Sequence, residues 1–183
     1  MPKRRMVVET EAAFDPRAFR QALGQFPTGV CIVTCRVDGE QLGMTMSSFN
    51  SLSLDPPLVL FSIDRRAASL PQWEKAESYA INVLSESQKD MSDRFARSLS
   101  NKWEGTSFAR GRLDAPVLHG IAAVFECVRW ARHGGGDHTL FIAEVKCFRS
   151  SIDRNPLVFS KGCYATLQST ESLAPLWPLD IHY

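Results

Sequence analysis

Short apolar segments separated by turn-forming residues constrain the fold of this chain more than any other feature of its sequence. Residues 30–35 form a β-branched, nearly continuous apolar run, which is typical of a strand buried on both faces. Further runs with strand character follow at 58–63, 79–84, 121–130 and 139–148. Because these segments do not alternate with regular helices, they favour a mainly β barrel or sandwich over a doubly wound parallel sheet.

Turn and cap signals divide the chain between these strands. Asp38-Gly39 favours a tight turn, so residues 30–35 and the extended pattern at 42–49 are predicted to form a hairpin. Three short helices are predicted: over 16–24 with Asp15 as N-cap, over 67–76, and after a capping box formed by Ser87 and Asp90.

Length and charge fit one compact domain. The chain has 183 residues, 44% of them hydrophobic, and its 21 basic and 20 acidic side chains leave a net charge of +1. This balance excludes a strongly basic nucleic-acid-binding protein. We expect a flexible arm over 1–13, one domain over 14–167 and an extended tail over 168–183, where Pro175 and Pro178 disfavour a helix.

No apolar segment is long enough for a signal peptide or a membrane span, so a cytoplasmic protein without membrane contact is expected. The chain has an odd number of cysteines, and none forms a C-x-x-C pair: Cys31, Cys35, Cys127, Cys147 and Cys163. Reduced thiols are therefore predicted, and no metal site is.

The segment over 43–53 is the first candidate for chemistry because it is rich in small hydroxyls. On one extended strand, a single face would carry Thr45, Ser47, Phe49, Ser51 and Ser53. Hydroxyl groups can contact the polar chain or the phosphate of a ligand, and the phenyl ring can support a planar group. A solvated strand face is the alternative interpretation.

Asp64-Arg65-Arg66 is the second candidate and follows the predicted strand 58–63 directly. Arginine side chains at a strand end can bind phosphate oxygens with two parallel hydrogen bonds. A solvated turn with idle charges is the alternative.

Residues 134–136 are three glycines, followed by Asp137 and His138, and form the third candidate. Glycines let the backbone approach a ligand closely, and a histidine at the start of a strand can donate a hydrogen bond or titrate near neutral pH. A flexible hairpin with an exposed histidine is the alternative. The common signatures of Rossmann, P-loop, zinc-protease and G-x-S-x-G hydrolase sites are absent from the sequence.

Several short stretches together resemble a known family. They occupy residues 19–24, 27–30, 43–49, 53–60, 81–84, 92–96, 136–145 and 156–157, and include GMT, SLDPPLVL, INVL, SDRFA and GDHTLFIAEV. In this order and at these spacings they resemble the short-chain flavin reductases, the reductase components of two-component flavin-dependent monooxygenases. The similarity extends from about Phe19 to Tyr164, most of the chain.

The resemblance implies a flavin-binding split β-barrel of the Greek-key type that works as a homodimer, with flavin at the subunit interface. By similarity, the flavin would be lined by Thr45, Met46, Ser47, Ser48 and Ser51. Arg65 and Arg66 would lie near its phosphate, and Asn82 near the cleft. His138 matches the family histidine that helps to place the nicotinamide and is the one residue predicted to be catalytic.

The activity implied is that of an NAD(P)H:flavin oxidoreductase, which reduces FMN or FAD with NADH or NADPH and supplies the reduced flavin to a partner monooxygenase. The cofactors supply the hydride chemistry and the protein supplies orientation, so no covalent nucleophile is needed. Two alternatives remain. One is a flavin-binding split barrel without reductase activity, and the other is a related reductase acting on a corrinoid or a metal chelate.

Overall fold

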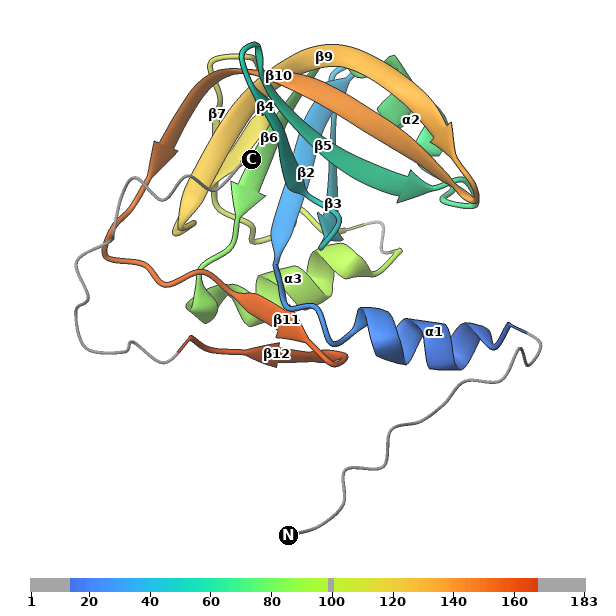
Figure 1. Ribbon diagram of the computed structural model, residues 1–183. Helices are drawn as coiled ribbons and strands as arrows, with labels where there is room; N and C mark the ends of the chain where they lie inside the picture. The colour runs from blue at the N-terminus through green and yellow to red at the C-terminus, as the bar shows by residue number, and fades with distance from the viewer. Residues whose placement is uncertain (1–13, 99–100, 168–183) are drawn as a thin grey trace, which may run out of the picture.

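The computed structural model describes residues 14–98 and 101–167, and one curved antiparallel sheet dominates it (Figure 1). The sheet has seven strands in the order β3-β2-β6-β9-β10-β5-β4. Their bounds are β2 (Cys31–Val37), β3 (Glu40–Met46), β4 (Asn50–Leu54), β5 (Pro57–Asp64), β6 (Ser78–Val83), β9 (Ala123–Gly135) and β10 (His138–Ser150). The predicted mainly β fold is thus confirmed.

Sheet order and chain connection together require the sheet to curl. Strands β3 and β4 lie at opposite ends of the order, yet only residues 47–49 join them. A connection this short spans at most about 14 Å, so the two edges must come close and the sheet forms a split barrel. Ser48 links the connection to β5, because its Oγ accepts a hydrogen bond from Ser62 N at 3.0 Å and donates one to Ser62 O at 3.2 Å.

The helices are short and lie outside the barrel (Figure 1). They are α1 (Pro16–Leu23), α2 (Leu70–Lys75), the 3-10 helix η1 (Glu86–Gln88) and α3 (Lys89–Ala96). The predicted N-cap is confirmed, since Asp15 Oδ1 accepts a hydrogen bond from Arg17 N at 2.8 Å. The predicted capping box was wrong by two residues: Ser85 and Gln88 form it, and it opens η1.

Five shorter strands complete the described chain. A small sheet contains β1 (Thr28–Gly29), β11 (Val158–Ser160) and β12 (Cys163–Ala165), and a hairpin contains β7 (Phe108–Arg110) and β8 (Pro116–Leu118). No helix in the described ranges is long and apolar enough to cross a membrane. The predicted arm over 1–13 and tail over 168–183 lie outside the described residues.

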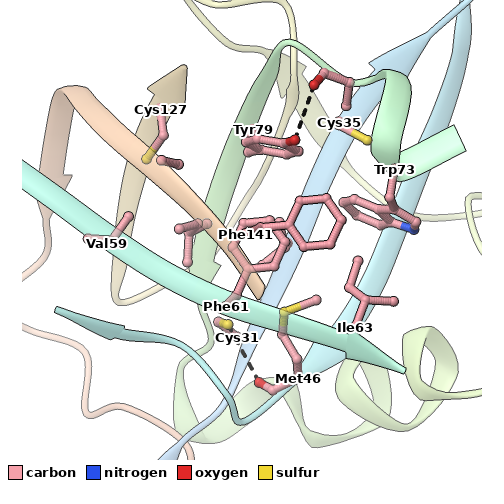
Figure 2. Packing of buried hydrophobic residues seen from close by; sticks show 14 residues of the cluster. Cys31, Cys35, Met46, Val59, Phe61, Ile63, Trp73, Tyr79, Cys127 and Phe141 are labelled. Carbon is pink, nitrogen blue, oxygen red and sulfur yellow. Dashed lines mark hydrogen bonds between the residues drawn. The ribbon is translucent and has the colours of Figure 1, made fainter. Parts of the chain in front are cut away.

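Two apolar clusters lie on the two sides of β2, which explains its nearly continuous apolar sequence. Val33 and Cys35 belong to the cluster inside the barrel, and Ile32 belongs to a second cluster with residues of α3 and β8. Figure 2 shows the inner cluster, where the rings of Phe61 and Phe141 stack at 5.1 Å between centroids. The prediction of a strand buried on both faces is confirmed.

The predicted continuous extended segment over 43–53 was wrong. Strand β3 ends at Met46, and β4 begins only at Asn50. In between, Phe49 packs against the inner cluster with its ring 5.6 Å from that of Phe125. Because the chain bends here and Phe49 packs inward, the hydroxyls of this segment do not share one strand face.

Candidate functional site

Two turns lie side by side at one end of β5 and β10: the arginine turn (residues 64–66) and the glycine–histidine turn (residues 134–138). In the strand register, His138 stands opposite Asp64 on β5 and opposite Gly135 on β9. A backbone hydrogen bond joins the two turns, because Arg65 N donates to Asp137 O at 2.9 Å. Two candidates 70 residues apart in sequence are thus parts of one local structure.

Arg66 and Arg65 are held differently within this structure. The Arg66 guanidinium, 81% exposed, lies 2.7 Å from Asp64 Oδ2. Hydrogen bonds from Arg66 hold the pKa of the Asp64 carboxyl well below its usual range, so Asp64 is ionised at neutral pH. Arg65 Nη2 lies only 2.5 Å from the point where a Cβ on Gly134 would stand. The absence of a side chain at Gly134 therefore leaves room for the Arg65 guanidinium.

His138 lies at the start of β10 with its side chain 41% exposed. Its Nδ1 is 2.7 Å from Asp137 Oδ1. This contact lowers the pKa of the Asp137 carboxyl, so Asp137 is also a carboxylate at neutral pH. The left-handed backbone of Gly136, with φ of 65°, forms the tight turn that precedes this pair.

Residues 43–53, called the hydroxyl segment below, come near the same end of the barrel at Ser48. Its partner Ser62 lies two residues before Asp64 on β5, which is about 7 Å along a strand. Ser47 and Ser51 are exposed. Thr45 points toward α3 instead, because its Oγ1 donates to Ser92 O at 2.7 Å.

The Met46 and Asn82 side chains lie in the interior. Met46 belongs to the inner cluster with 8% exposure, so its side chain packs in the core. Asn82 is fully buried: its Nδ2 donates to Ile32 O at 3.0 Å, and its Oδ1 accepts from Leu118 N at 2.9 Å. Its carboxamide links three strands, which is a structural role; its predicted place near the flavin stays a prediction.

Two residues of this region were not singled out from the sequence. Ser62 is half-buried on the outer side of β5, and the alternation of that strand was the signal that could have found it. Asp137 was noted only as part of the glycine–histidine turn. Its position directly before a histidine was a signal, but a side-chain hydrogen bond between chain neighbours depends on the local backbone.

The fold is a split barrel, and the arginine turn and the glycine–histidine turn adjoin at one end of β5 and β10, with the contact between Ser48 and Ser62 two residues earlier on β5. A family model described as "Flavin reductase like domain" matches residues 23–168. The chain belongs to this family.

Relatives and solved structures agree with this family. The chain is 41% identical over 152 residues to the "Stachydrine N-demethylase reductase subunit Stc3" of Rhizobium meliloti, covering 82% of this chain and 66% of that protein. A "nitrilotriacetate monooxygenase component B" homologue from Mycobacterium thermoresistibile has a TM-score of 0.84 and 33% identity, covering 91% and 94% of the two chains. An NADH:FAD oxidoreductase from Streptomyces globisporus, solved with NAD and FAD fragments, has a TM-score of 0.82 and 31% identity, covering 88% and 99%.

The chain does not span all of the first curated relatives that it matches. It covers 66% of the Stc3 protein and 50% of a second Rhizobium meliloti protein, named "Probable flavin reductase".

Proposed function

We propose that this chain reduces FMN or FAD with NADH or NADPH and passes the reduced flavin to a partner monooxygenase. The observation that carries the proposal is the hydrogen bond from Arg65 N to Asp137 O. It joins the arginine turn, whose guanidinium groups can bind a phosphate, to the glycine–histidine turn, whose His138 can orient a nicotinamide. The names of similar proteins support it, since they include a demethylase reductase subunit, a monooxygenase component and an NADH:FAD oxidoreductase.

The donor set fits a phosphorylated flavin. The exposed guanidinium groups of Arg65 and Arg66 offer charge-assisted hydrogen bonds to a phosphate, and the exposed hydroxyls of Ser47 and Ser51 offer neutral ones to a polar chain. A bound flavin would supply the hydride acceptor. The chain would bind the flavin phosphate, hold the ring beside the backbone of the hydroxyl segment, and orient the nicotinamide through His138.

The activity is tested by mixing the purified full chain with NADH or NADPH and free FMN or FAD, and following the absorbance of the reduced nicotinamide. We expect consumption that depends on added flavin. Flavin binding without consumption would identify a flavin-binding protein instead. Consumption with a corrinoid or a metal chelate, and none with free flavin, would identify the other reductase class.

A homodimer belongs to this proposal because two apolar surfaces of the chain lack cover in the described structure. No residue of α1 is buried, and Phe19 and Leu23 are 48% and 57% exposed. A stable amphipathic helix usually packs its apolar side against protein. On β5 and β10, Leu60 and Ile142 are half-buried and paired on the outer face that also carries Asp64 and His138. A second copy on this face would adjoin the candidate site.

Leu23→Asp should weaken this dimer, because a carboxylate would replace an apolar contact on α1. Size-exclusion chromatography with light scattering is expected to show a dimer for the natural chain and a lower mass for the variant at equal concentration. Gln21→Asp is the matched control, since it adds the same charge to an exposed polar position of the helix. A monomeric natural chain would refute the dimer, and an unchanged mass for Leu23→Asp would remove α1 from the interface.

A cytoplasmic location is also proposed, supported by the cysteines. All five are free, and Cys31, Cys35 and Cys127 are buried. Burial raises the pKa of these three thiols to about 12, so they stay protonated and unreactive inside the barrel. Free thiols are usual in a reducing compartment. Within 14–98 and 101–167, no group of three metal-ligating side chains occurs.

A further inference from the structure

Two carboxylates lie near His138, but only one is available to it. Asp64 stands opposite His138 in the register, yet it already accepts hydrogen bonds from Arg66 N at 2.8 Å and from Arg66 Nη2 at 2.7 Å. Asp137 Oδ1 lies 2.7 Å from His138 Nδ1. The orientation of the imidazole is therefore set by its own chain neighbour.

The backbone holds Asp137 in a fixed place for this contact. Asp137 O accepts the hydrogen bond from Arg65 N at 2.9 Å, and the left-handed Gly136 directs the chain into β10. The Asp137 side chain is itself 78% exposed, so it contributes little to the packing of the barrel. A substitution at this position should leave the fold intact.

The chemistry of the pair defines the two ring nitrogens. An ionised carboxylate has only acceptor atoms, so the Nδ1 that contacts it must carry the hydrogen. In a neutral imidazole the other nitrogen is then an acceptor. The Nε2 of His138 is left bare and cannot donate in this form.

We propose that Asp137 is a positioning residue that holds neutral His138 in its Nδ1–H form, so that Nε2 accepts a hydrogen bond from the carboxamide N–H of the nicotinamide. The inference rests on the proposed function and adds the direction of one hydrogen bond. His138 accepts from the amide N–H of the cofactor and does not donate to its carbonyl oxygen.

The first test is spectroscopic and needs no activity. Long-range ¹H–¹⁵N correlation spectra of the labelled protein at about pH 8.5, above the usual range of histidine titration, report which ring nitrogen carries hydrogen. With His138 assigned through His138→Gln, we expect the Nδ1–H form in the natural chain and a shift toward the Nε2–H form in Asp137→Ala. Nε2–H in the natural chain would overturn the proposal.

The second test is a kinetic comparison of NADH with its reduced 3-acetylpyridine analogue, in which a methyl group replaces the amide nitrogen. Asp137→Ala should lower kcat/KM for NADH about 3- to 10-fold, mainly through KM, which is the loss expected for one neutral hydrogen bond. The analogue should lose little, since it has no amide hydrogen to offer. The quantity compared between variants is the ratio of kcat/KM for NADH to kcat/KM for the analogue, so the different intrinsic reactivity of the analogue cancels.

Three controls separate this role from others. Asp137→Asn should retain part of the Nδ1–H form and part of the preference for NADH over the analogue, because its amide oxygen can still accept from Nδ1. Asp153→Ala removes an exposed carboxylate elsewhere and should change nothing. Equal losses for both cofactors in Asp137→Ala would overturn the positioning role. Absence of any flavin-dependent NADH consumption in the natural chain would instead refute the proposed function, whatever the spectra show.

Discussion

His138→Ala is expected to lower kcat/KM for NADH about 10- to 100-fold, because removal of the whole side chain leaves the amide group of the bound nicotinamide without its partner, which costs more than a net hydrogen bond. The reason is geometric. His138 stands at the start of β10, is held at 2.7 Å by Asp137, and adjoins the arginine turn through the register of β5 and β10. Steady-state kinetics with NADH as the varied substrate and saturating FMN measure the effect.

His138→Ala should weaken the use of NADH and leave the binding of the flavin nearly unchanged. The dissociation constant of FMN, measured by fluorescence quenching, is expected to change less than about 2-fold, because the phosphate contacts belong to Arg65 and Arg66. His133→Ala on β9 is the matched control, since it removes an exposed imidazole opposite Leu140 in the same sheet. Equal weakening of NADH and FMN binding by His138→Ala would show that the histidine supports the whole candidate site and has no specific contact with the nicotinamide.

Local sequence signals predicted the strands and turns well because each depends on a few neighbouring residues. The hairpin of β2 and β3 turns at Asp38 and Gly39, whose φ angles of 52° and 85° are the left-handed values that Asp-Gly favours. The Asp15 cap and the helix after it follow from equally local chemistry.

What the sequence pattern missed depends on distant residues. Alternation along 43–53 places Phe49 among the hydroxyls, but the core position beside Phe125 draws its ring inward. Asn82 follows a strand pattern like any polar residue, and only the three-dimensional structure shows that Ile32 and Leu118 satisfy its carboxamide. Contacts between residues this far apart in sequence are invisible to local periodicity.

The candidate site shows the same division. The arginine turn and the glycine–histidine turn were each recognised as a motif, yet nothing in either motif states that they meet. Their meeting depends on the pairing of β5 with β10, and the register that sets Asp64 opposite His138 is a property of the whole sheet. Only the resemblance to a family predicted that both motifs belong to one site.

Gly43→Ala is expected to destabilise the protein by about 1–3 kcal/mol, the usual cost of overpacking a core. A Cβ at this position on β3 would lie 2.5 Å from Phe95 Cε1 and 3.1 Å from Trp103 Cζ2. Phe95 is fully buried, and its ring meets that of Trp103 edge-on at 5.0 Å. Because Phe95 is fully buried, we expect its ring to have no space to turn into, so that α3 shifts away from β3. Thermal unfolding followed by circular dichroism should show Tm lowered by about 3–10 °C.

Gly29→Ala is the matched control for this variant, because nothing lies within 4 Å of a Cβ there. If Tm falls equally in both variants, loss of glycine itself is the cause and the contact with Phe95 is not. Phe95→Leu combined with Gly43→Ala should be less destabilised than the sum of the single variants, since the smaller side chain relieves the overlap.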